Sequence, residues 1–244
     1  IGLFSFLTVH FFIFIITIFL ILDKKYLPTV NTKSFDLNIL KKLSGFTLIA
    51  VVSFALTPLS ETLIRNFTIE SINLNYAGFW DGLNKLSQSI LSFFSLTLSV
   101  YFLPKFSSIK NLDRLKKELI IGLKFILIPL FMILFLVFFL KSFVIELLFS
   151  KSFLVINEYV LIQFIGLFFK TIAWVFGYLF ISRNLIKPFL FFEIVFQFLY
   201  VFFSYLLLKS FGFWGLVYSF ALINFLYVFF SGIYIFKFFL NNNK

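Results

Sequence analysis

The sequence predicts an all-α fold in a polytopic membrane protein, and three observations carry this prediction. Of 244 residues, 61% are hydrophobic and 13% are charged, whereas soluble domains are roughly 45 to 50% apolar and about 25% charged. The apolar residues gather in stretches of about 20, the length that a helix needs to cross about 30 Å of hydrocarbon. No stretch alternates like a transmembrane β-strand. Because backbone polar groups in lipid must be paired internally, helices are the expected spans.

The apolar stretches predict about seven transmembrane helices. In chain order we expect them at 3–22, 43–60, 76–103, 119–140, 158–182, 188–208 and 214–236. Pro58 is expected to end the second helix and Pro129 to kink the fourth, because proline removes one N–H from the helical ladder and crowds the preceding turn.

The distribution of lysine and arginine predicts the orientation of these helices. The connections after the first, third and fifth helices hold, together with the C-terminal end, fourteen of these residues, and the alternate connections hold four. Positive residues are enriched in cytoplasmic connections, so we expect the chain to begin outside and to end inside. The net charge of +11 then belongs mainly to a cytoplasmic rim that suits anionic lipid head groups, and nucleic-acid binding is disfavoured.

The start of the chain predicts a division into bundles. Ile1 leads almost directly into a span, without the charged start and cleavage site of a signal peptide. The odd number of helices departs from the even number of a repeat-built transporter. We expect residues 1–22 to be the last helix of a truncated N-terminal bundle and the basic, proline-containing segment 23–42 to be a cytoplasmic linker. Residues 43–240 would then form a six-helix C-terminal bundle, and 241–244 a cytoplasmic tail.

A polar stripe follows the third expected helix. Spacings of four, three, four, three and four place on one face the residues Asp81, Lys85, Gln88, Ser92, Ser95 and Ser99. Lys85 lies roughly 14 Å from the outer end of the helix, close to the membrane centre. Ionisable groups at this depth are functional candidates, so we expect the stripe to face a water-filled cavity or protein. The alternatives are a structural Asp81–Lys85 pair at i,i+4 and serines that only hydrogen-bond their own helix or its neighbours.

The fifth and sixth expected helices repeat this theme. One face of the fifth carries Gln163, Gly166, Lys170, Ala173 and Gly177, with Lys170 about 18 Å from the outer end and small residues that admit a neighbouring backbone. The sixth carries Glu193 and Gln197 on one face, and pairing of Glu193 with Arg183 or Lys187 is the alternative. The predicted pathway residues are Asp81, Lys85, Gln88, Gln163, Lys170, Glu193 and Gln197. The candidates for ion coupling are His10, Asp81 and Glu193, although His10 fits a packing role as well.

Several classes of protein are disfavoured by the residues. The absence of cysteine and the single histidine argue against a thiolate or histidine metal cluster, and we expect no metal, no cofactor and no catalytic residue. A membrane glycosyltransferase or polymerase would need clustered acids or a large external loop, but the longest expected one, 61–75, holds only Glu61, Arg65 and Glu70. A seven-helix receptor of the retinal type would carry its lysine in the last span, which has none before Lys237.

The sequence in and after the third expected helix resembles that of a known protein family. The stretch AGFWDGLNKLS at 77–87, followed by YFLPKFSS at 101–108, is similar to Wzx-type polysaccharide flippases, the O-antigen and lipid-linked oligosaccharide translocases of the MOP exporter superfamily. The matching residues are Ala77, Gly78, Phe79, Trp80, Lys85, Leu86, Ser87, Tyr101, Leu103, Pro104 and Lys105. Asp81 departs from the pattern, which has an uncharged polar residue such as glutamine there.

The resemblance implies a non-enzymatic transporter with two bundles, of which the six-helix bundle here is the C-terminal one. Its implied activity is translocation of undecaprenyl-pyrophosphate-linked oligosaccharide across the bacterial inner membrane by alternating access, for surface polysaccharide synthesis. Lys85 and Lys170 would attract the pyrophosphate in a shared cavity, and Gln88, Gln163 and Gln197 would bind sugar hydroxyls.

The same resemblance implies partners and an alternative. The implied partners are the lipid-linked oligosaccharide, membrane lipid and polysaccharide assembly proteins. A multidrug or ion antiporter of the same superfamily is the alternative, and for a cationic cargo it would favour carboxylates over lysines in the cavity.

Overall fold

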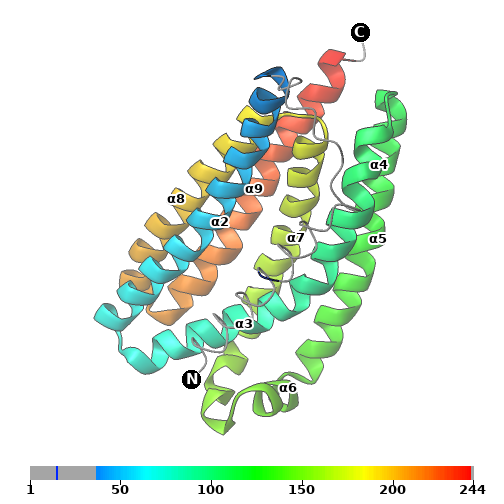
Figure 1. Ribbon diagram of the computed structural model, residues 1–244. Coiled ribbons are helices and arrows are strands. Elements are labelled where there is room, and N and C mark those ends of the chain that lie inside the picture. Colours follow the sequence, from blue (N-terminus) through cyan, green and yellow to red (C-terminus); the bar gives the residue numbers. More distant parts are fainter. Residues whose placement is uncertain (1–14, 16–36, 243–244) are drawn as a thin grey trace. The chain divides into compact units, whose positions relative to one another are not determined.

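The computed structural model describes residues 37–242 together with residue 15, and these form helices joined by short turns (Figure 1). This confirms the predicted all-α class. Two compact units divide the chain, 1–43 and 44–244, and the account below concerns the second. His10, the span predicted at 3–22 apart from residue 15, most of the linker and the last two residues lie outside the described part.

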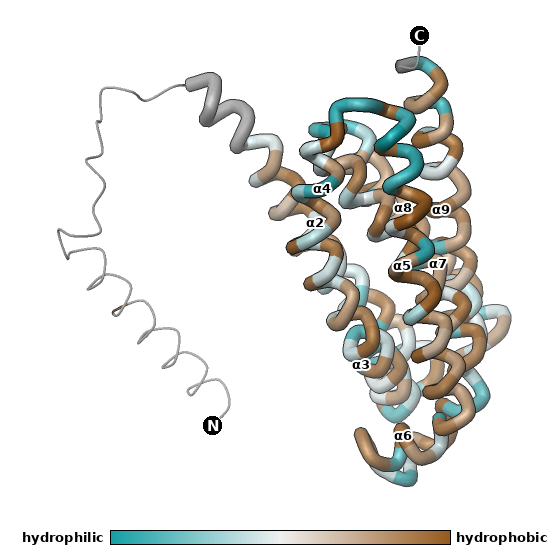
Figure 2. The backbone as a smooth tube through the Cα atoms, turned by 90° about the vertical axis from the view of Figure 1, so that its right-hand side faces the viewer, coloured by the Kyte–Doolittle hydropathy of each residue, from teal (hydrophilic) through white to brown (hydrophobic). Residues whose placement is uncertain are grey.

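Six helices of the described chain are long and apolar enough to cross a membrane. They coincide with the last six predicted spans and comprise Ser44–Ser71, Leu74–Ser108, Leu112–Phe139, Val160–Ser182, Ile186–Phe211 and Phe213–Asn241. Hydrophobic residues, drawn in brown in Figure 2, predominate along these helices, and many large apolar residues are exposed, with Phe54 at 84%. Soluble proteins rarely expose contiguous apolar surface on this scale, so lipid is the expected surrounding of these helices.

Helix α2, Leu37–Ser71, is longer at both ends than the span predicted at 43–60. Pro58 lies inside this helix and does not end it, so that prediction was wrong. Transmembrane helices tolerate proline when nearby groups restore the lost hydrogen bonds. Here the hydroxyl of Thr62 donates to the Pro58 carbonyl at 2.8 Å.

The extension of α2 replaces the predicted external loop at 61–75 with a tight turn. Only Ile72 and Asn73 separate α2 from α3, Leu74–Thr97. The side chain of Asn73 caps α3 by accepting a hydrogen bond from the Tyr76 N–H at 3.0 Å. The two helices therefore form a hairpin whose arms diverge away from the turn (Figure 1).

The second span changes its winding near its end. A π-helical turn, η2 at Leu98–Phe102, joins α3 to α4, Leu103–Ser108, and the Leu103 N–H donates to the Leu98 carbonyl five residues earlier. Pro104 follows directly, and a proline ring crowds the turn before it. The wider π turn gives that ring room without breaking the span.

A helical connection that the sequence did not predict follows the third span. Helix α5, Leu112–Phe139, contains Pro129, and α6, Lys141–Leu148, with the 3₁₀ helix η3, Lys151–Glu158, leads to the next span. The Lys141 ammonium donates to the Asn157 carbonyl at 3.0 Å, which ties α6 to η3.

The last three spans form the best-packed part of the bundle. Helix α9, Phe213–Asn242, packs along both α7, Val160–Ser182, and α8, Ile186–Phe211. Aromatic rings fill the spaces between them. The rings of Phe180 and Phe192 stack at 5.8 Å, and those of Phe196 and Tyr227 meet edge to face at 5.2 Å, both favourable geometries.

The basic connections gather at one end of the bundle. The α4–α5 connection, the α7–α8 connection and the C-terminal end of α9 lie together at the top of Figure 1, while α6 and the α8–α9 turn lie at the other end. This alternation is what the distribution of lysine and arginine predicts for antiparallel spans.

The α8–α9 turn depends on two glycines. Gly212 has φ +59° and ψ −142°, a conformation essentially restricted to glycine. A Cβ on Gly215 would overlap the backbone carbonyl of Leu207, so the start of α9 lies directly against the end of α8.

We predict that Gly215→Ala destabilises the protein by about 1 to 3 kcal/mol, the usual cost of overpacking. The measurement is thermal unfolding of the purified protein in detergent. Gly78→Ala is the matched control, because a Cβ at Gly78 meets nothing within 4 Å. Equal unfolding temperatures for the two variants would contradict the close approach of α8 and α9.

Candidate functional site

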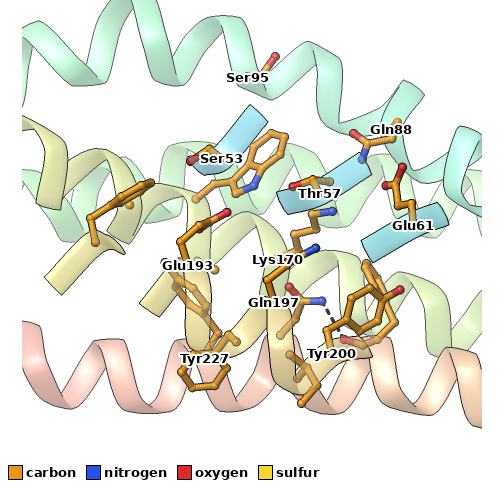
Figure 3. A pocket seen from close by; sticks show the side chains of 18 of the residues that line it. Ser53, Thr57, Glu61, Gln88, Ser95, Lys170, Glu193, Gln197, Tyr200 and Tyr227 are labelled. Atoms are coloured by element: carbon orange, nitrogen blue, oxygen red, sulfur yellow. Dashed lines mark hydrogen bonds between the residues drawn. The ribbon is translucent and has the colours of Figure 1, made fainter. Parts of the chain in front are cut away.

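A cavity of about 470 Å³ opens among α2, α3, α7, α8 and α9, within the spans (Figure 3). Small-molecule sites commonly measure about 300 to 1,000 Å³. All five helices contribute polar side chains, which comprise Ser53, Thr57, Glu61, Asn84, Gln88, Ser95, Lys170, Glu193, Gln197 and Asn224. Aromatic residues complete the wall, among them Trp174, Tyr178, Tyr200 and Tyr227.

Helical periodicity explains why these side chains share one space. On α2, residues Ser53, Thr57 and Glu61 recur every four positions and therefore lie on one face. On α8, Glu193 and Gln197 have the same spacing. Figure 3 shows these side chains directed from their helices into the common space. On α2 and α8, a polar face therefore turns toward the cavity.

Among the described residues, Lys170 on α7 is the only lysine that lines the cavity. Its ammonium lies 5.5 Å from the centroid of the Phe220 ring on α9, which is a cation–π geometry. The charges that act on it are the carboxylates of Glu61 and Glu193. Within the described residues, the ammonium makes no hydrogen bond and no ion pair, so its three donors are free for a ligand.

The charge of the cavity differs from the predicted one. Two lysines were expected to share the hollow, but Lys85 does not line it, and its side chain is exposed on α3 beside the cavity-lining Asn84. Residues 84 and 85 point about 100° apart on a helix, so one can face the cavity while the other does not. The wall therefore carries one ammonium and two carboxylates, and it is not the cationic surface expected from the sequence.

Asp81 also lies outside the cavity wall. Its carboxylate pairs with the Arg65 guanidinium of α2 at 3.0 Å, and both side chains are partly exposed. This ion pair joins the two arms of the α2–α3 hairpin. The expected i,i+4 pair with Lys85 is not formed, because the long helix α2 brings an arginine closer.

Gln163 is a packing residue in this structure. Its side chain is fully buried, and its amide nitrogen donates to the Ser87 hydroxyl of α3 at 3.0 Å. Its amide oxygen has no partner among the described residues. The predicted contact of Gln163 with sugar hydroxyls therefore finds no support, because the residue is enclosed between α3 and α7.

The serine row of the second span, which continues from α3 into η2, bonds mainly to its own helix. The hydroxyls of Ser92, Ser95 and Ser99 each donate to the carbonyl three residues earlier, at 2.7, 2.9 and 3.1 Å. Only Ser95 of this row lines the cavity. This arrangement matches the structural alternative that the sequence left open for these serines.

The residues that carry the family resemblance, at 77–87 and 101–108, mainly make contacts between helices. Trp80 is buried, and its ring meets that of Phe213 on α9. Lys105 donates to the Tyr101 hydroxyl at 2.7 Å and pairs with Glu118 of α5, so it ties α4 to α5. Gly78 has open space around it, and Pro104 follows the π turn.

Glu193 lies in the cavity and does not pair with the basic residues near it in sequence. The guanidinium of Arg183 donates to the Ile109 carbonyl, and Lys187 is exposed without an ion pair among the described residues. Of the seven predicted pathway residues, the structure brings four together: Gln88, Lys170, Glu193 and Gln197.

Sequence reasoning missed the contribution of α2 to the cavity. Glu61 was assigned to an external loop because Pro58 was expected to end the helix. The recurrence of Ser53, Thr57 and Glu61 every four residues was the signal that the helix continues. Asn84 was missed because it lies one position beside the stripe that contains Lys85.

The fold and the cavity define a class: a polytopic membrane protein with a polar binding cavity inside its spans. The chain is similar to curated proteins named Lipid III flippase from Escherichia coli (strain K12) and from Shigella flexneri. Each is 29% identical over 161 residues, which are 66% of this chain and 39% of the relative. The match therefore spans about two fifths of the length of these flippases. No protein-family model and no solved structure matches the chain.

We predict that Ser87 and Gln163 are coupled energetically. Interhelical hydrogen bonds in membranes contribute about 0.6 kcal/mol on average and up to about 1.7, so a double-mutant cycle of Ser87→Ala and Gln163→Leu should give a coupling energy in this range. Unfolding in mixed micelles measures it. Additive effects of the two substitutions would show that the hydrogen bond contributes nothing.

Proposed function

We propose that this protein is a MOP-type flippase that moves a lipid-linked oligosaccharide across a membrane by alternating access. The observation that carries the proposal is the polar cavity around the unpaired Lys170, in a chain 29% identical to Lipid III flippases. A polar head group cannot cross hydrocarbon without compensating contacts. The cavity supplies such contacts, while the lipid tail stays in the bilayer.

The wall suits a saccharide. The side chains of Gln88 and Gln197 make no hydrogen bond within the described chain, so their amides are free to pair with sugar hydroxyls. Tyr200 and Trp174 add flat apolar faces to the same wall. Aromatic faces and a few placed polar groups are the usual composition of a small-molecule site.

In this proposal, Lys170 binds the anionic part of the cargo. A phosphate oxygen is a stronger partner for an ammonium than an aromatic face. Glu61 and Glu193 lie near enough to act on Lys170, so they balance its charge when the cargo is absent. Lys85 and Asp81, which lie on α3 outside the wall, belong to the part of the pathway beyond this cavity.

The finer assignment follows the resemblance. We propose a Wzx-type flippase of the bacterial inner membrane, with undecaprenyl-pyrophosphate-linked oligosaccharide as cargo and surface polysaccharide synthesis as the process. The basic end of the bundle and the C-terminus would face the cytoplasm. Polysaccharide assembly proteins are the proposed partners.

We predict that Lys170→Ala reduces flipping at least tenfold, because the neutral side chain leaves the phosphate without a partner and the carboxylates of Glu61 and Glu193 without a counter-charge. The measurement is surface polysaccharide in cells that depend on this protein for its export. Lys170→Arg should keep part of the activity, since the positive charge remains.

Lys151→Ala is the control, because Lys151 is exposed on η3, far along the chain from every cavity-lining position, and its loss should leave export unchanged. Lys170→Ala, Lys170→Arg and Lys151→Ala must all reach the membrane at the wild-type level. Normal export by Lys170→Ala would refute the role of the cavity in phosphate recognition.

A drug or ion antiporter is the second candidate, and the two carboxylates of the wall favour it. Glu61 and Glu193 outnumber the single lysine, and carboxylates suit a cationic cargo. The two functions separate experimentally. As a flippase, the protein should give no protection against cationic drugs, and Glu193→Gln should leave drug sensitivity unchanged. Protection that disappears in Glu193→Gln and Glu61→Gln would select the antiporter.

A further inference from the structure

Lys124 lies inside the most apolar of the six spans and takes no part in the cavity. Its side chain is exposed on α5. The residues three and four positions away are isoleucine or leucine, so the helix itself offers no carboxylate partner. Within the described chain, the ammonium makes no ion pair and no hydrogen bond. A charge in this place needs a partner from outside the bundle.

An apolar groove runs beside Lys124. It measures about 380 Å³ and is lined by Lys124 itself together with Ile120, Leu123, Leu127, Ile128, Phe131, Met132 and Phe168 of α7. From residue 120 to 131 the helix rises about 16 Å. This is close to half of the hydrocarbon thickness of about 30 Å, which is the length that one acyl chain spans.

The position of Lys124 near the basic end of α5 favours an anionic partner. Lys124 lies seven residues after Lys117, about 10 Å along α5 and on the same face. Side chains on a helix lean toward its N-terminus, and the N-terminal end of α5 carries Arg114, Lys116 and Lys117. The ammonium therefore extends toward a basic rim that attracts anionic lipid head groups.

We propose that Lys124 and this groove bind an anionic phospholipid, with the phosphate at the ammonium and an acyl chain along α5 and α7. A helix seated in the groove would have to supply a carboxylate, and the predicted span at 3–22 contains none. No residue of α5 lines the cavity, so the lipid site is separate from the proposed pathway and does not depend on it.

The test is lipid titration of the purified protein by native mass spectrometry, with phosphatidylglycerol and zwitterionic phosphatidylcholine. The wild type should prefer phosphatidylglycerol. Lys124→Leu should weaken its binding about fivefold, the contribution of one lysine near an anionic surface, and Lys124→Arg should retain it. Lys237→Leu, which removes the same charge from an exposed position on α9 at the same end, should weaken binding less, because Lys237 does not line the groove.

Three outcomes would overturn the proposal. These are equal binding of the two lipids by the wild type, unchanged phosphatidylglycerol binding in Lys124→Leu, and an equal loss in Lys237→Leu. A further titration adds polyprenyl phosphate to the phosphatidylglycerol at the same concentration. Displacement of phosphatidylglycerol that requires Lys124 would assign the site to the carrier lipid and reject the phospholipid. Thermal unfolding of each variant verifies its fold. If Lys124→Leu unfolds, Lys124→Gln, which also removes the charge, decides the matter by the same loss of phosphatidylglycerol binding.

Discussion

The cost of keeping the Lys170 ammonium inside an apolar bundle shapes the cavity around it. A lysine at the centre of a span opposes insertion by roughly 2.5 to 3.5 kcal/mol. Three groups share the cavity wall with this ammonium: the Phe220 ring of α9, which it approaches at 5.5 Å, and the carboxylates of Glu193 on α8 and Glu61 on α2. Because these groups come from three helices, the charge can be kept only where the bundle is assembled around it.

Close packing of α9 makes this assembly possible. Gly166 of α7 lies against Phe220 and the backbone of α9, and Gly215 lets α9 start directly against α8. Small residues allow such approach between helices in a membrane, where the hydrophobic effect does not drive association. The ring that accepts the Lys170 charge is therefore placed by a contact that a larger residue at 166 would block.

Lysines within the spans of this protein have different roles according to the direction in which each one points. Lys170 faces the inside of the bundle and meets aromatic and acidic groups, whereas Lys124 faces outward beside an apolar groove. The helical face on which each lysine lies decides which neighbours its ammonium reaches.

The helical class, the six described spans and the alternation of basic connections could be predicted from the sequence, since they depend on local composition and length. Periodicity along each helix also selected four residues that line the cavity, Gln88, Lys170, Glu193 and Gln197. The pairing of Asp81 with Arg65 in place of Lys85 and the enclosure of Gln163 between α3 and α7 depend on contacts between helices, which the sequence does not reveal. Periodicity shows which residues share a face of one helix. It does not show which helix lies opposite, because that depends on how all the helices pack together.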